Sequence, residues 1–124
     1  MYFLSRAEID KLHAFSLQQF GGTDGVRCEV ALESAICAPA NDFHYRGASL
    51  AEIAASYAFH ISQAQAFLDG NKRTAVTAAF TFLEINGVNT EVDSYPLHEA
   101  LEKVALQEMS KAEFTDFVRR LLGL

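Results

Sequence analysis

A group of residues between positions 65 and 73 has the types and the spacing that could bind a polyphosphate. Gly70 lets the backbone come close to a ligand, Arg73 offers a planar guanidinium to phosphate oxygens, and Lys72 adds a second cation. Asp69 supplies a hard oxygen ligand of the kind that Mg²⁺ prefers. Asp69-Gly70-Asn71 is also turn chemistry, so these side chains are expected in a loop. The pattern predicts a loop that binds phosphate groups together with a magnesium ion.

The element that must position this loop is the apolar run that follows it, Thr74–Asn86. Its one charged residue is Glu84, and apolar or small residues occupy every face, which is typical of a buried helix. The first turn of a helix has backbone N–H groups without partners inside the helix, so anions bind there readily. An ordinary helix cap beside a solvated Lys-Arg pair is the alternative on these residues alone. We favour a binding site because the charged side chains stand at the mouth of a buried helix.

The same run resembles the motif of the Fic/Doc family, His-x-Phe-x-Asp/Glu-Gly-Asn-Gly/Lys-Arg. The matching positions are Phe67, Asp69, Gly70, Asn71, Lys72 and Arg73. Lysine at position 72 is the variant typical of the Doc (death-on-curing) branch. Phe20-Gly21-Gly22, Leu32–Ala35 and Phe82–Gly87 also look like parts of Doc-like domains, so the similarity covers roughly the first 90 residues.

This resemblance implies a Doc-like toxin-type transferase that binds ATP and Mg²⁺. It implies that Asp69 holds the metal, that Gly70, Asn71, Lys72 and Arg73 bind the nucleotide, and that Asp69 and Arg73 also serve catalysis. With lysine at position 72, the implied reaction is transfer of phosphate, rather than AMP, to a hydroxyl of a protein target such as a translation factor. A small antitoxin that folds onto the protein is an implied partner.

One position departs from the family pattern. Gln65 stands where the family has its catalytic histidine, and Ala64 and Ala66 stand where Asn and Pro are usual. The histidine is a general base, which typically contributes about a hundred- to ten-thousand-fold in rate, and an amide cannot accept the proton. Three hypotheses follow: a weakened transferase, a pseudoenzyme that binds a nucleotide or a protein, and a repurposed site with different chemistry.

Two other histidines are candidates for a substitute base. His60 lies five residues before Gln65 inside an apolar stretch, where a packed and hydrogen-bonded core histidine is the favoured interpretation. His44 lies in a segment that could approach the site. His13 and His98 are further from the motif in the sequence.

About six stretches carry helical signals, whereas strand alternation is nearly absent. Capping-box patterns at Ser5–Glu8, Ser49–Glu52 and Ser110–Glu113 predict three helix starts. A second helix is expected from about Val26 to Cys37, ending before Ala38-Pro39 because the residue ahead of a proline avoids the helical region. The expected apolar faces include Ile9, Leu12, Phe15 and Leu17 near the start, and Leu97, Leu101, Val104 and Leu106 after Pro96. We therefore predict an all-α bundle of about six helices around the buried motif helix, which agrees with the family's fold.

The segment 40–47 has aromatic residues and turn formers but no helical period, so it is expected to be a loop or a short hairpin. In the family the corresponding piece is a flap that holds the target polypeptide as an added strand. A plain connecting loop is the alternative.

Composition limits the remaining possibilities. The 124 residues allow one domain, 1–124, and 10 Lys and Arg against 16 Asp and Glu give a net charge of −6, which argues against general nucleic-acid binding. No secretory signal is visible, and the apolar stretches are too short to span a membrane. Cys28 and Cys37 lack zinc spacing and are expected to be reduced thiols, so a cytoplasmic protein is predicted.

Overall fold

The fold consists of helices only. The computed structural model describes residues 1–124. The helices are α1 (Arg6–Phe20), α2 (Glu29–Arg46), α3 (Leu50–Ala64), α4 (Asn71–Ile85), α5 (Tyr95–Ala105) and α6 (Lys111–Leu122). No strand forms, and one isolated bridge joins Val26 to Phe67. The predicted all-α bundle of six helices is thus confirmed.

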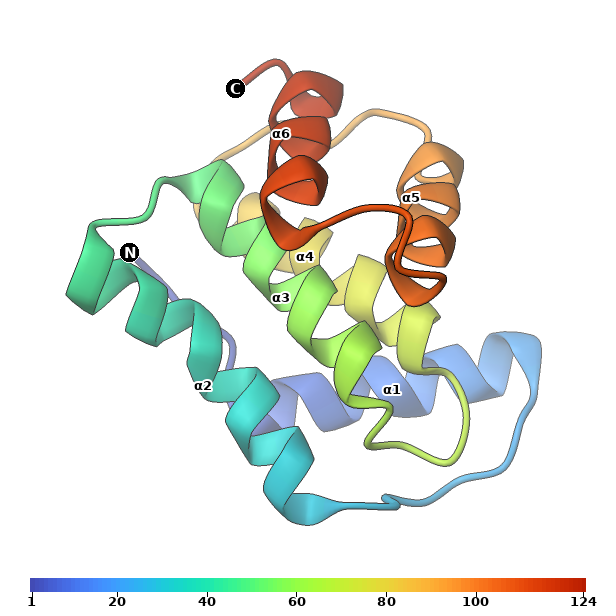
Figure 1. Ribbon diagram of the computed structural model, residues 1–124. Coiled ribbons are helices and arrows are strands. Elements are labelled where there is room, and N and C mark those ends of the chain that lie inside the picture. The colour runs from blue at the N-terminus through green and yellow to red at the C-terminus, as the bar shows by residue number, and fades with distance from the viewer.

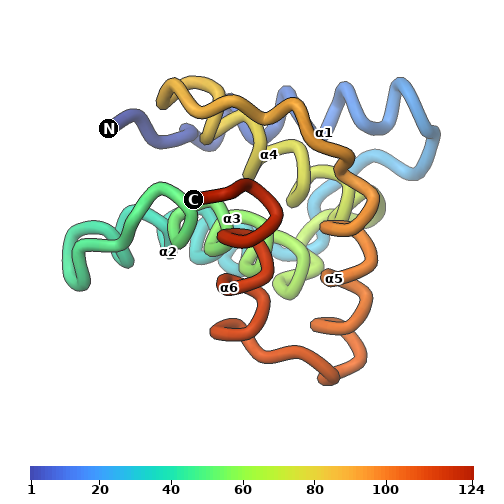
Figure 2. Tube along the Cα trace, turned by 90° about the horizontal axis from the view of Figure 1, so that it is seen from above, coloured from blue at the N-terminus to red at the C-terminus, as the bar shows by residue number.

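Helices α3 and α4 form the centre of the bundle and pack most extensively on each other (Figure 1). Seen from above, α1 lies on one side of this pair, while α5 and α6 lie on the other (Figure 2). The motif helix α4 contacts α1, α3 and α5, and most of its apolar residues are buried, as the sequence predicts. None of the six helices combines the length and the apolar composition that crossing a bilayer requires.

Short side chains are frequent among the buried residues of the two central helices. The fully buried alanines are Ala51, Ala54, Ala55 and Ala58 on α3 and Ala75, Ala78 and Ala79 on α4. Because the distance between packed helices depends on the side chains at the contact, alanine allows the two backbones to lie close together. The loop that joins them, which carries the motif, is therefore held at both ends by a tight interface.

All three predicted capping boxes form. In each, the serine hydroxyl accepts a hydrogen bond from the backbone N–H of the glutamate three residues on, and the glutamate accepts one from the serine N–H. The hydrogen bonds donated by the serine backbone and hydroxyl stabilise the charged glutamates, so the pKa values of Glu8, Glu52 and Glu113 lie below their usual range.

Helix α2 differs from the sequence prediction. It begins at Glu29 rather than Val26, continues through the buried Pro39, and ends at Arg46 instead of Cys37. The predicted loop, hairpin or flap at 40–47 was wrong, because residues 40–46 are helical and only Gly47 leaves the helix, with a left-handed φ of 64°.

Tertiary contacts explain why the helix continues beyond the proline. The ring of Phe43 packs against that of Phe3, with the ring centroids 5.7 Å apart. The half-buried carboxylate of Asp42 accepts hydrogen bonds from the Ser56 hydroxyl at 2.7 Å and the Lys111 ammonium at 3.2 Å. These long-range contacts stabilise the second half of α2 and outweigh the local tendency to end at Ala38-Pro39.

Helix α1 buries the expected face only in part, since Ile9 is buried and Leu12 packs against the core, but Phe15 does not. Its buried residues are Ile9, His13 and Ser16, whereas Phe15 is 57% exposed. Two of the three are polar because this face meets the polar motif loop, as described below. Leu106 was likewise expected in an apolar face, but it follows the end of α5 and is exposed.

Candidate functional site

The motif loop runs from Gln65 to Gly70 and joins the two central helices. Gln65 caps α3 in a left-handed conformation, with φ 45° and ψ 42°. Gly70 caps α4, also left-handed, with φ 80°. A Cβ atom on Gly70 would lie 3.5 Å from the imidazole of His13, which is ordinary contact, so the positive φ rather than a lack of space favours glycine here.

Asn71 holds the loop in shape from the first position of α4. Its side-chain oxygen accepts a hydrogen bond from the Phe67 N–H, and its NH₂ group donates one to the Phe67 carbonyl, both at 3.0 Å. The predicted nucleotide-binding residue Asn71 thus satisfies both backbone groups of a residue that is 1% exposed. In this arrangement it shapes the loop.

We expect Asn71→Ala to lower the free energy of unfolding by about 1–3 kcal/mol, because it leaves the N–H and the carbonyl of Phe67 without partners. Urea denaturation of the variant measures this difference. The matched control is Asn41→Ala, since Asn41 is exposed and its side chain makes no hydrogen bond. Equal denaturation midpoints for the two variants would contradict this role of Asn71.

An extended segment, 21–28, lies along the outside of the loop. The Arg27 and Cys28 N–H groups donate to the Ala66 carbonyl at 2.6 Å and 3.2 Å, and the Leu68 N–H donates to the Gly25 carbonyl at 3.0 Å. This segment is therefore the part of the chain that pairs with the motif loop. The sequence does not predict this pairing, because nothing local marks Gly25–Cys28 as a partner of residues 66–68.

His13 supports the loop from α1. Its ring stacks on Phe67 with centroids 3.7 Å apart, and its Nε2 lies 2.8 Å from the Asp69 carbonyl oxygen, which accepts the hydrogen bond. His13 is 4% exposed. His13 is far from the motif in the sequence, but the spacing of Ile9, His13 and Ser16 marks one helical face and could have revealed its role.

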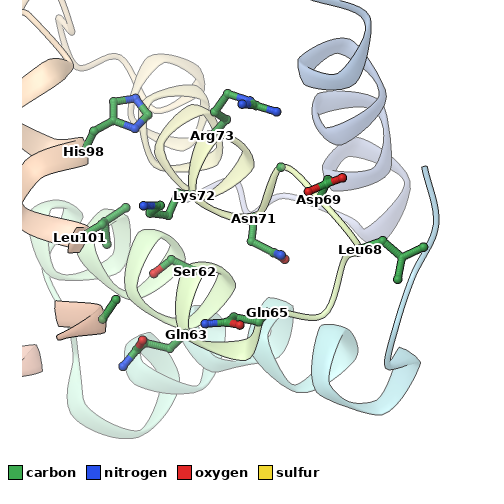
Figure 3. A pocket seen from close by; sticks show the side chains of 12 residues that line it. Ser62, Gln63, Gln65, Leu68, Asp69, Asn71, Lys72, Arg73, His98 and Leu101 are labelled. Atoms are coloured by element: carbon green, nitrogen blue, oxygen red, sulfur yellow. The ribbon is translucent and has the colours of Figure 1, made fainter. Parts of the chain in front are cut away.

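A cavity of about 360 Å³ opens beside this loop. Its wall contains every residue predicted for the site. The lining residues are Ser62, Gln63, Gln65, Leu68, Asp69, Gly70, Asn71, Lys72, Arg73, His98, Leu101 and Ala105. Figure 3 shows that they come from the end of α3, the motif loop, the start of α4 and the facing side of α5. The structure thus brings Gln65 and Asp69–Arg73 to one cavity, and it adds a wall from α5 that the sequence did not suggest.

The two motif cations are already engaged within the chain. Lys72 forms an ion pair with Glu102 of α5. The guanidinium of Arg73 donates from Nε to the Ser16 hydroxyl at 3.0 Å and from Nη2 to the Gly21 carbonyl at 3.2 Å. It also lies over the Phe20 ring, 5.1 Å from the centroid. Nη1 of Arg73 has no partner in the chain, so this end of the guanidinium can still donate a hydrogen bond to a ligand.

The donor set around Asp69 fits a magnesium ion bound together with phosphates. One carboxylate oxygen of Asp69 accepts the Thr23 N–H at 2.8 Å, and the other makes no hydrogen bond in the chain. No group of three or more His, Cys, Asp or Glu side chains converges anywhere in the molecule. Mg²⁺ usually keeps several waters and binds through one or two carboxylates plus substrate phosphates, so a single free carboxylate oxygen suits it.

Neither predicted substitute base lines the cavity. His60 is half-buried on α3, with its Nε2 2.9 Å from the Lys111 ammonium, which confirms the expected hydrogen-bonded histidine. Burial, reinforced by Lys111, lowers its pKa. His44 is exposed near the end of α2 beside Phe3, so the expectation that it could approach the site was wrong.

Comparison with known proteins agrees with this geometry. A model of the Fic/DOC family matches residues 3–83. The chain is 32% identical over 124 residues to the protein kinase doc of Escherichia phage P1, with 99% of this chain and 98% of that protein covered. It is 40% identical over 76 residues to Toxin Doc of Mycolicibacterium smegmatis, with 60% of this chain and 58% of that protein covered. The chain belongs to the Fic/Doc family.

Proposed function

We propose that this Doc-like, toxin-type protein binds ATP with Mg²⁺ in the cavity and transfers phosphate to a hydroxyl of a protein target, at a rate reduced by Gln65. The observation that carries the proposal is the start of α4. No side chain caps this helix, its first turn contains no acidic residue, and its first residues line the cavity. Helices α1, α3 and α6 begin with complete capping boxes, and the start of α5, which also lacks a side-chain cap, lies outside the cavity. The N–H groups of the first turn of α4 are therefore available to an anion, beside Lys72 and Arg73.

Each residue then has a defined task. Asp69 offers its free oxygen to the metal, which when bound neutralises part of the phosphate charge. The backbone of Gly70–Arg73 and the two cations hold the phosphates, and Lys72 exchanges its ion pair with Glu102 for the ligand. The target hydroxyl oxygen bonds to the γ-phosphorus, the bond to the ADP oxygen breaks, and the hydroxyl proton passes to solvent. Gln65 can orient that hydroxyl but cannot accept its proton, so positioning supplies most of the remaining rate.

The partners we propose follow the names of the relatives, one a protein kinase and the other a toxin. A toxin of this kind implies a small antitoxin and a protein target, for which a translation factor is our proposal. Transfer of AMP in place of phosphate is the less favoured reaction. The thiols of Cys28 and Cys37 are free and exposed, which supports a place in the reducing cytoplasm.

A pseudoenzyme that binds a nucleotide or a protein without catalysis is the second candidate. Two observations favour it. Gln65 cannot act as a base, and both motif cations already have partners within the chain, because Lys72 pairs with Glu102 and Arg73 donates to the Ser16 hydroxyl. In that case the protein binds a nucleotide or a protein partner and transfers no phosphate.

Calorimetric titration of ATP with Mg²⁺ tests the shared part of both candidates. We expect the wild type to bind and Arg73→Ala to bind at least about tenfold more weakly, since a hydrogen bond to a charged group contributes about 1.5–3 kcal/mol. Ser16→Ala is the matched control, because it removes the Nε acceptor of Arg73 and keeps the guanidinium.

Binding retained in Ser16→Ala and lost in Arg73→Ala supports a phosphate site. No wild-type binding at millimolar nucleotide would refute nucleotide binding altogether. Binding without any transfer to protein, even after histidine is introduced at position 65, would favour the pseudoenzyme.

A further inference from the structure

His98 is a cavity residue that the motif does not include. It lies on α5, outside the residues 3–83 that match the family model. His98 lines the cavity, and Figure 3 shows its ring on the α5 side, near Lys72 and Leu101 and away from Gln65. The ring is half-buried and forms no hydrogen bond within the chain. An imidazole with both nitrogens unused therefore lines a cavity that also contains Gln65, the residue at the position of the motif histidine.

The charges that act on this ring are those of two cations. From α4, Lys72 and Arg73 act on His98, and from its own helix Glu102 partly offsets Lys72 through their ion pair. The end of α3 contributes uncharged side chains to the cavity, and on the motif loop the one acid is Asp69. Burial is the largest influence, with the two cations next, and together they lower the pKa of His98. In the unliganded protein the imidazole is thus neutral at neutral pH.

We propose that His98 contacts a phosphate group of the bound nucleotide and takes up a proton from solvent when the nucleotide binds. A phosphate beside Lys72 and Arg73 offsets their charge, and its oxygens accept the imidazole N–H. Both effects favour the imidazolium. The inference rests on the proposed nucleotide site, and it adds a phosphate-binding residue from α5.

The direction of the pH dependence follows. Because the protonated form gains an interaction in the complex, binding is expected to strengthen as pH falls from about 8 to about 6, the range in which imidazole titrates. A rise of about one in the pKa of His98 on binding corresponds to about tenfold tighter binding at the acidic end. In His98→Gln this contribution disappears, since the amide can donate a hydrogen bond but does not titrate.

Calorimetry of Mg²⁺–ATP in buffers of different ionisation enthalpy counts the protons taken up on binding. The γ-phosphate of ATP titrates in the same range, so the informative quantity is the difference between wild type and His98→Gln. We expect greater proton uptake by the wild type at about pH 6.5. The matched control is His60→Gln, because His60 is also half-buried with a lowered pKa but lies outside the cavity. The His60→Gln variant should take up as many protons on binding as the wild type.

An NMR titration of the wild-type imidazole signals, with and without Mg²⁺–ADP, provides a second test. It does not depend on whether the His98→Gln variant folds. A raised pKa of His98 in the complex supports the proposal. Equal proton uptake in wild type and His98→Gln, or an unchanged His98 titration in the complex, would overturn it while leaving the nucleotide site intact. Absence of any nucleotide binding by the wild type would overturn the proposed function itself, so the two failures are distinguishable.

Discussion

Replacing Gln65 with histidine is expected to raise the rate of phosphate transfer by about a hundred- to ten-thousand-fold, the usual contribution of a general base. The backbone of residue 65 is left-handed, with φ 45°, and histidine is among the residues that adopt this region more often than most. The variant therefore gains a base without new strain. Asp69, Gly70 and Arg73 keep their positions, because their contacts do not involve the side chain of residue 65.

The measurement is incorporation of label into the proteins of a bacterial extract, from ATP labelled at the γ-phosphate and, in parallel, at the α-phosphate. Label from the γ-position identifies phosphate transfer, and label from the α-position identifies AMP transfer. Gln65→Asn is the matched control, because asparagine also accepts a left-handed backbone and has no titratable group. If Gln65→His transfers no more label than Gln65→Asn, the missing base alone does not explain a low rate of transfer.

Replacing Phe67 with alanine should lower the free energy of unfolding by about 3–5 kcal/mol, the usual cost of truncating a buried phenylalanine. Phe67 is 1% exposed and stacks on the ring of His13, so the variant loses burial and leaves a cavity between α1 and the loop. The hydrogen bond from His13 to Asp69 also loses its packing support. Denaturation in urea measures the change.

Leu68 provides the matched control for this experiment. It is the next residue of the same loop, yet it is 40% exposed, so Leu68→Ala removes less buried surface and should cost much less stability. A similar loss of stability for both variants would mean that the loop is held by its backbone hydrogen bonds rather than by the Phe67 ring.

Local signals in the sequence were sufficient for most of the fold. The three capping boxes form because serine and glutamate satisfy each other's backbone groups within one helical turn, and such contacts are independent of the rest of the chain. The burial of α4 could be predicted because its apolar residues cover every face. The loop before α4 could also be predicted, since Asp69-Gly70-Asn71 is a sequence typical of turns.

The parts that could not be predicted depend on contacts between distant residues. Pro39 is a local signal to end a helix, but Asp42 and Phe43 anchor the chain beyond it to α3, α6 and the amino terminus. His13 reaches the site through the docking of α1, and His98 through the docking of α5. Neither lies near the motif in the sequence, so only the tertiary arrangement brings them to the loop.

The left-handed backbone at residue 65 has a consequence for the gene. The codons of glutamine and histidine differ only in their third base, so one nucleotide exchange converts either residue into the other. Because the backbone at Gln65 is one that histidine also accepts, such an exchange leaves the surrounding structure in place. A single mutation can therefore remove or restore histidine at position 65, while the other residues that line the cavity are inherited unchanged.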